Sequence, residues 1–379
     1  MNKSYTRIGA VIGILTLIGL GSIIVFLPPK TPETTSEVRE KVYVALEGEG
    51  KIAVINTKDN SVIRSIDLTQ EHGGDITRYM AHNVQVTPDG TSVLVTANIA
   101  DGDMEHGGEE SMADMDDHGE NLDELIVIDP RTDIITRRIP VESDSHLAHV
   151  VAKGATAFVT LQEKGMVYAV DIQTGEILRK TNLGEGSGPH GLRLTPDGSE
   201  AFIALLDGKG VARLNTATGE AETTQLPGAV VQTAVTPDGA YAFASLYDTK
   251  EVAWFDLQSG GQGSIALPTD SRGPVQLYPT PDSRYLYVVD QGYYFEEPTG
   301  TLVYRIAIAD KSVDASIVAG SAPHGVVVAR DGTRAYVTNL LSNDVSVIDT
   351  TSNKEIARIP VGTMPNGISV WNAEFGGTP

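Results

Sequence analysis

The sequence predicts an all-β protein, a seven-bladed β-propeller that is closed by one C-terminal and three N-terminal strands. From Lys41 onward, short runs of β-branched residues alternate with Gly, Asn, Asp and Pro, which is typical of many short strands. A turn of the TPDG type recurs between these runs, and a marker residue returns at intervals of roughly forty residues. The turns begin at Val86, Leu194, Val235, Pro279 and Ala329, and the markers are His82, His149, His190, Val231, Val275, His324 and Asn366.

A unit of this length with four strands is typical of a propeller blade, so seven markers predict seven blades. We expect the strand that starts at each marker to be innermost (strand a), followed outward by strands b, c and d. The first three strands, at residues 42–45, 52–56 and 63–68, have no strand a before them. Residues 367–371 supply it from the other end of the chain, and this closure removes the free sheet edges of an open ring.

The segment from Arg334 to Val370 reads RAYVTNLLSNDVSVIDTTSNKEIARIPVGTMPNGISV. It closely resembles the repeat of the YVTN β-propeller family, exported seven-bladed propellers that are related in architecture to the propellers of cytochrome d1-type enzymes. The resemblance covers Val42 to Trp371. It implies the fold and export, but no particular chemistry, because propellers carry many different activities.

An uncharged apolar stretch at residues 8–27 follows Lys3 and Arg7 and is long enough to span a bilayer. We expect a single-pass membrane anchor with the propeller on the periplasmic or extracellular side, since the basic residues precede the span. A signal peptide that is cleaved to release a secreted propeller is the alternative. The expected organisation is a cytoplasmic segment at 1–7, the anchor or signal peptide at 8–27, a linker at 28–40, the propeller at 41–373 and a tail at 374–379.

Composition excludes several classes of function. The chain has no cysteine, which removes disulfides, thiolate metal sites and cysteine nucleophiles. A formal net charge of -22 argues against nucleic acid as a partner, because the protein would repel phosphate backbones. The sequence also lacks nucleotide-binding and nucleophile motifs and gives no signal for haem.

Two insertions fall between strands b and c, on the face where the d to a connections also emerge. The first, residues 101–124, contains eleven acidic residues and no basic one. It is either a solvated acidic loop or a set of metal ligands, with copper favoured by its methionines and zinc next. The second, residues 291–300, carries Tyr293, Tyr294 and Phe295, and either binds a protein partner or packs on a neighbouring blade. The candidate ligands of the first insertion are Met104, His106, Met112, Met115 and His118.

Four histidines at marker positions predict a transition-metal site at one end of the central channel, where the innermost strands converge. They are His82, His149, His190 and His324, with Asn366, His146 and His72 as possible additions. The alternative is that duplication copied one histidine whose ring merely bonds a neighbouring carbonyl. Val231 and Val275 are expected to form an apolar wall of the channel, opposite the histidines.

Three functions are compatible with this pattern: a metal-binding or metal-handling propeller, a protein-interaction or adhesion scaffold, and a metal-dependent lyase or hydrolase that uses a channel histidine as base. We favour the first and assign no catalytic residue. The third would need a substrate-sized cleft on the histidine face.

Overall fold

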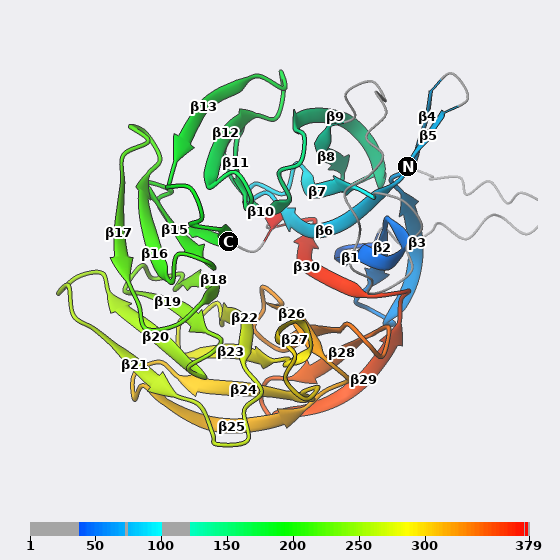
Figure 1. Cartoon of the computed structure of the whole chain (residues 1–379). Coiled ribbons are helices and arrows are strands. Elements are labelled where there is room, and N and C mark those ends of the chain that lie inside the picture. Colours follow the sequence, from blue (N-terminus) through cyan, green and yellow to red (C-terminus); the bar gives the residue numbers. More distant parts are fainter. Residues whose placement is uncertain (1–37, 73–74, 101–121, 375, 378–379) are drawn as a thin grey trace, which may run out of the picture. The chain divides into compact units, whose positions relative to one another are not determined.

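The computed structural model describes residues 38–72, 75–100, 122–374 and 376–377. These residues form seven antiparallel blades arranged around a central channel, with one innermost strand from each blade at the channel, and one further two-stranded sheet (Figure 1). The predicted seven-bladed β-propeller is therefore confirmed. The predicted anchor at 8–27 lies outside the described residues, among which no helix is long and apolar enough to cross a membrane.

Blades 1 to 6 follow one another along the chain, each with its strands in the order a, b, c and d. Blade 1 comprises β6 (Tyr79–Val86), β7 (Val93–Ile99), β8 (Asp123–Asp129) and β9 (Ile134–Glu142). Blade 2 comprises β10 (Leu147–Lys153), β11 (Thr156–Leu161), β12 (Met166–Asp171) and β13 (Ile177–Asn182). Blade 3 comprises β14 (Pro189–Leu194), β15 (Glu200–Leu205), β16 (Gly210–Asn215) and β17 (Ala221–Gln225).

The second half of the ring repeats this order. Blade 4 comprises β18 (Val230–Val235), β19 (Tyr241–Leu246), β20 (Glu251–Asp256) and β21 (Gln262–Ala266). Blade 5 comprises β22 (Pro274–Pro279), β23 (Tyr285–Asp290), β24 (Leu302–Ala307) and β25 (Ser312–Val318). Blade 6 comprises β26 (Pro323–Val328), β27 (Arg334–Asn339), β28 (Asp344–Asp349) and β29 (Lys354–Pro360).

Blade 7 joins the two ends of the propeller. Its strand a is β30 (Pro365–Asn372), which pairs antiparallel with β1 (Glu40–Leu46). Strands β2 (Lys51–Asn56) and β3 (Ser61–Asp67) complete the blade, and β31 (Gly376–Gly377) pairs with the other edge of β30. This is the closure by one C-terminal and three N-terminal strands that the sequence predicts.

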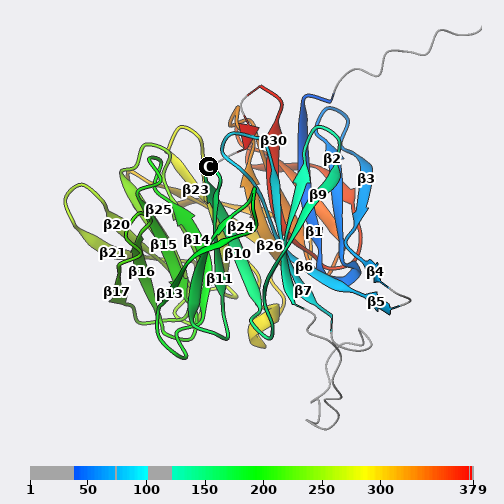
Figure 2. The same ribbon diagram turned by 90° about the horizontal axis from the view of Figure 1, so that it is seen from above.

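Three short elements lie in the connections. The hairpin of β4 (Gln70–His72) and β5 (Asp75–Thr77) precedes blade 1, and the 3-10 helices η1 (Glu47–Glu49) and η2 (Tyr293–Phe295) connect strands b and c in blades 7 and 5. The hairpin and the yellow η2 lie on the same face of the disc (Figure 2). The b to c and d to a connections therefore share one face, as expected.

The core lies between the blades. Middle strands such as β7 and β27 are buried along almost their whole length, because both faces of each sheet pack against neighbouring sheets. Outer strands such as β29 alternate between half-buried and exposed residues, as strands with one solvated face do. The near-continuous apolar runs of the sequence therefore belong to strands b and c.

A hydroxyl in strand b fastens neighbouring blades together. Thr338 Oγ1 in blade 6 accepts the Gly325 N–H at 2.7 Å and donates to the Asn366 carbonyl of blade 7 at 2.7 Å. This hydroxyl belongs to the threonine of the YVTN tetrapeptide, so the repeat motif satisfies two buried backbone groups on adjacent innermost strands. Equivalent pairs of bonds are made by Thr96, Thr160 and Ser245.

The first insertion ends two residues earlier than expected, because strand c of blade 1 begins at Asp123 rather than Leu125. Asp123 is buried and accepts hydrogen bonds from the Ile99 N–H at 2.9 Å and the Ser145 hydroxyl at 3.0 Å. Glu124 is also buried and accepts a hydrogen bond from Arg138 at 2.8 Å. Both acids belong to the fold, whereas residues 101–121 lie outside the described residues.

We predict that replacing residues 101–121 with a short turn leaves the unfolding free energy nearly unchanged, since Ile99 and Asp123 already bring the strand ends together. A matched deletion that extends through Glu124 should cost about 2 kcal/mol or more, because it removes the partners of buried donors. Urea unfolding of the two variants tests this. Equal loss of stability in both would show that 101–121 itself supports the fold.

Removing β30 should abolish cooperative unfolding of the propeller, because the edge of β1 would be left unpaired and the ring open. The test compares thermal unfolding of a chain ending at Met364 with that of a chain ending at Ala373. The longer chain lacks β31 but keeps β30, and it should melt close to the full-length protein. A Met364 truncation that melts like wild type would contradict the role of closure.

Candidate metal centre

The four marker histidines do not all share one register in the structure. The backbone N–H that bonds the strand-b hydroxyl belongs to Asn83 in blade 1, Gln232 in blade 4 and Gly325 in blade 6, each one residue after its marker. In blade 2 it belongs to His149 itself, so the true marker is Ala148. The expected common register is therefore wrong for His149.

The error has a physical cause. In blade 3, a TPDG turn of five residues connects β14 to β15, whereas β10 and β11 of blade 2 are joined through Gly154 and Ala155 alone. Blade 2 thus has no TPDG turn from which to count back. The marker of blade 2 therefore lies one residue earlier, at Ala148, than the spacing of the repeats predicts.

Three histidines come together at the channel: His82 in β6, His146 in the connection between β9 and β10, and His190 in β14. One ring nitrogen from each lies within 4.8 Å of the others, so this group of three could hold a metal ion. The centroid of the His82 ring lies 4.7 Å from that of the His146 ring and 5.7 Å from that of the His190 ring. Two of them were predicted as principal ligands and His146 as an additional one; metal binding itself stays a prediction.

The connection that carries His146 is anchored on both sides. The Asp123 carboxylate accepts a hydrogen bond from the Ser145 hydroxyl, and the Asn98 side-chain oxygen accepts one from the Leu147 N–H at 2.6 Å. His146 itself has a φ of 39°, a left-handed conformation that is uncommon outside glycine. Asn98 and Asp123, which precede and follow residues 101–121 in the sequence, therefore both bind the connection that carries His146.

The hydrogen bonds of His82 and His190 leave their Nε2 atoms free to coordinate. The Nδ1–H of His82 donates to the Glu47 carboxylate at 3.1 Å, and the Nδ1–H of His190 donates to the Val231 carbonyl at 2.9 Å. Both partners accept hydrogen bonds only, so the proton is on Nδ1 and the lone pair on Nε2. His82 Nε2 is buried without a hydrogen-bond partner among the described residues.

His149 and His324 have the opposite tautomer. The Gln232 amide oxygen accepts the Thr233 N–H at 2.9 Å, which turns the amide NH2 toward His149 Nδ1 at 3.3 Å. Gln291 donates likewise to His324 Nδ1 at 2.6 Å. Since these Nδ1 atoms accept, both rings carry their proton on Nε2. The network therefore favours His149 and His324 as donors rather than as metal ligands.

Four of the channel imidazoles, those of His146, His149, His190 and His324, are held neutral. Burial and the neighbouring His82 ring lower the pKa of His146 to about 3, and the same two causes lower the pKa of His190 to about 3. Burial also lowers the pKa of His324 to about 4 and places the pKa of His149 well below its usual value. Neutral imidazole is the form that binds metals, so protons compete weakly with a metal here at neutral pH.

Glu47 belongs to this site and was missed in the sequence. Besides His82, its carboxylate accepts hydrogen bonds from the Asn366 amide at 2.7 Å and the Tyr294 hydroxyl at 3.0 Å. Burial alone would raise the pKa of Glu47, but the bonds from His82 and Asn366 outweigh it and lower the pKa to about 2. The available signal was its place directly after β1, in a b to c connection on the histidine face.

The remaining predicted residues are distributed differently. Asn366 donates a hydrogen bond to Glu47 at 2.7 Å, and the same amide nitrogen lies 3.4 Å from His82 Nδ1. His72 is the last residue of β4. Val231 and Val275 are buried in an apolar cluster, as the predicted dry wall requires. The insertion residues Met104, His106, Met112, Met115 and His118 lie outside the described residues.

The aromatic residues of the second insertion have separate roles. Phe295 stacks on Tyr247 of blade 4 with ring centroids 3.6 Å apart, which is the packing alternative. The Tyr294 hydroxyl donates a hydrogen bond to the Glu47 carboxylate. Its ring meets the His324 ring edge-on, with the ring centroids 5.5 Å apart. Tyr293 is partly exposed, and binding of a protein partner by this connection stays a prediction. This connection therefore covers part of the channel mouth.

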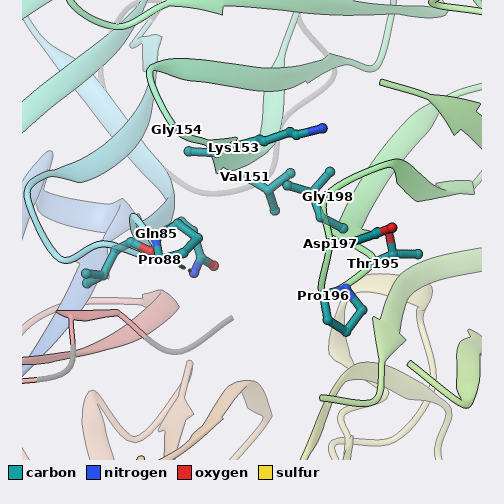
Figure 3. A pocket seen from close by; sticks show the side chains of 12 residues that line it. Gln85, Pro88, Val151, Lys153, Gly154, Thr195, Pro196, Asp197 and Gly198 are labelled. Carbon is teal, nitrogen blue, oxygen red and sulfur yellow. Dashed lines mark hydrogen bonds between the residues drawn. The ribbon is translucent and has the colours of Figure 1, made fainter. Parts of the chain in front are cut away.

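A cavity of about 200 Å³ lies at the other end of the innermost strands, among the a to b turns of blades 1, 2 and 3 (Figure 3). Its walls include Gln85, Pro88, Val151, Lys153 and Asp197. None of these lining residues is a histidine. This cavity is therefore not the substrate cleft that a histidine-based lyase would need beside His82.

Comparison with solved structures finds the same fold at low sequence identity. Hydrazine synthase of Kuenenia stuttgartiensis is 18% identical with a TM-score of 0.59, over 78% of this chain and 93% of that chain. A proposed 6-phosphogluconolactonase of Bacteroides fragilis is 13% identical with a TM-score of 0.64, over 90% and 99%. Dihydro-heme d1 dehydrogenase NirN, solved in complex with DHE, is 15% identical with a TM-score of 0.56, over 92% and 78%.

At these identities the likeness shows the fold alone. No family model matches the sequence, and no curated protein matches it. The fold and the site together define a seven-bladed β-propeller with a buried histidine group that could hold a metal ion. Membership of the YVTN family stays a prediction.

The lowered histidine pKa values predict that the metal-free protein loses stability in acid. Unfolded histidine binds a proton near pH 6.5, but His324 resists protonation until about pH 4 when folded. The unfolded state therefore binds more protons in this window, and stability falls as the pH drops from 6.5 toward 4. Replacing His324 with Gln should reduce this loss by about 2 kcal/mol between pH 6.5 and 4.5.

Urea unfolding with a chelator present, at pH 6.5 and pH 4.5, measures the difference between wild type and His324→Gln. Identical acid destabilisation of the two proteins would contradict a buried neutral His324.

Proposed function

We propose that this protein binds or handles a transition metal at the mouth of its propeller channel, with copper favoured and zinc next. The observation that carries the proposal is the group formed by His82, His146 and His190, whose candidate ligand atoms lie within 4.8 Å of one another. Imidazole suits copper, zinc, iron and nickel. Three imidazoles with one open position are typical of sites where a metal exchanges or binds a further ligand.

The surroundings of the group support this proposal. Glu47 holds His82 by its Nδ1–H, and a carboxylate in this position fixes the ring orientation and makes Nε2 a stronger ligand. The Val231 carbonyl does the same for His190. The two strongest candidate ligands are thus oriented before any metal arrives.

Copper is favoured by the first insertion. Asp123, near the C-terminal end of the insertion, accepts hydrogen bonds from the Ile99 N–H and from Ser145 in the connection that carries His146. The residues between Ile99 and Asp123 include three methionines and many acids, which would raise the local cation concentration and offer soft ligands. Zinc comes next, because the three imidazoles alone satisfy it.

The proposed setting is the outer side of a membrane. The apolar stretch at 8–27 and the resemblance to exported YVTN propellers support an exported, membrane-anchored protein. The b to c connections, including the partly exposed Tyr293, offer a face for a protein partner. We propose that such a partner exchanges the metal with this site.

The test is a titration of the metal-free propeller with copper and with zinc. A triple variant, His82→Ala, His146→Ala and His190→Ala, should bind at least about a hundredfold more weakly than wild type, because it loses all three ligands. His324→Ala is the matched control: it removes a buried imidazole of the same channel register but leaves the group intact, so its affinity should stay near that of wild type.

Equal affinity of the triple variant and wild type would place the metal elsewhere. Absence of binding by wild type would favour the interaction or adhesion scaffold. The metal content of freshly purified protein distinguishes copper from zinc, since affinity alone favours copper at most nitrogen sites.

A further inference from the structure

The His149 ring presents a buried N–H to which the described part of the chain offers no acceptor. Its Nδ1 accepts a hydrogen bond from the Gln232 amide, so its proton is on Nε2. His149 is 1% exposed, and its Nε2 has no hydrogen-bond partner among the described residues. A buried donor that lacks an acceptor costs roughly 1–3 kcal/mol. In native structures such a group is usually satisfied by a bound water or ion.

The donor lies against the proposed metal ligands. The His149 ring is 4.9 Å from the His190 ring and 5.8 Å from the His82 ring, centroid to centroid. Both of those rings have Nε2 lone pairs available, whereas His149 has an N–H. A ligand that occupies the open, fourth coordination position of the metal would thus meet the N–H of His149 as a hydrogen-bond donor.

The charges indicate what that molecule is. The three imidazoles of the group bind a metal in their uncharged form, and the Glu47 carboxylate, which accepts hydrogen bonds from His82, Tyr294 and Asn366, supplies one negative charge. A divalent metal would therefore leave a net charge of one positive unit in a buried site, where uncompensated charge is costly. A monoanion would neutralise it and would also supply the acceptor for His149.

We infer that the open position takes a small anion that coordinates the metal and accepts a hydrogen bond from His149 Nε2–H. This inference rests on the proposed metal site. It makes His149 a residue that binds the anion, and Gln232 a positioning residue that sets the tautomer of His149. Hydroxide and small inorganic or carboxylate anions share the required chemistry.

The backbone of blade 3 is shaped to allow this arrangement. Gly191 lies between His149 and Gln232, and a Cβ at this position would collide with the Gln232 amide. The absence of a side chain at Gly191 lets Gln232 of blade 4 reach His149 of blade 2. The donor is thus held by contacts that span three blades.

The experiment is an azide titration of the copper(II)-loaded protein, followed by the charge-transfer absorption of the copper–azide complex. His149→Phe fills a similar volume without an N–H, and His149→Gln keeps an N–H donor. Copper affinity is measured for each protein first, and it should change by less than about threefold, because His149 is not one of the three ligands.

Azide binding should weaken about tenfold to a hundredfold in His149→Phe, which corresponds to the loss of one hydrogen bond to a charged acceptor. His149→Gln should stay within about threefold of wild type. Equal azide affinity in all three proteins, or equal loss in both variants, would overturn the role of the N–H donor. Copper-loaded wild type that binds no azide would overturn this inference alone, and wild type that binds no copper would overturn the proposed function with it.

Discussion

The pairing of β30 with β1 is the constraint on which the rest of the structure depends. It closes the ring with strands from the two ends of the propeller, and it also assembles the site. Glu47 follows β1 directly, Asn366 lies in β30, and the two side chains are bonded across 319 positions of sequence. His82 comes from the blade next to this seam. The carboxylate that orients His82 is therefore in place only when the ring is closed.

The hydroxyls of strand b extend this constraint around the channel. Thr160 accepts the His149 N–H at 2.9 Å and donates to the His190 carbonyl at 2.7 Å, so one side chain fixes the backbones of two channel histidines on adjacent blades. The interaction that fastens blade 2 to blade 3 is thus also the interaction that places an N–H donor beside a metal ligand. Stability and site geometry share the same hydrogen bonds.

The repeat made the fold predictable, because turn motifs and strand patterns recur locally along the chain. It also led to His82 and His190, whose blades keep the common register. His149 was misplaced by one residue because blade 2 lacks the TPDG turn. Glu47 was missed because its partners lie in distant blades.

Tautomers are a further feature that sequence patterns do not specify. All four marker histidines look equivalent in the sequence, yet His82 and His190 face acceptors, while His149 and His324 face the amides of Gln232 and Gln291. Which nitrogen carries the proton depends on these contacts between blades. The division into ligands and donors therefore follows from the closed ring and not from the repeat.

The central claim is that the closed ring presents three imidazole nitrogens to one metal ion beside Glu47. The most direct measurement is anomalous X-ray diffraction from crystals of the copper-loaded protein, recorded at the copper absorption edge. The account predicts one strong anomalous peak about 2.0 Å from ring nitrogens of His82, His146 and His190. A peak away from all three rings, or no peak in copper-soaked crystals, would contradict it.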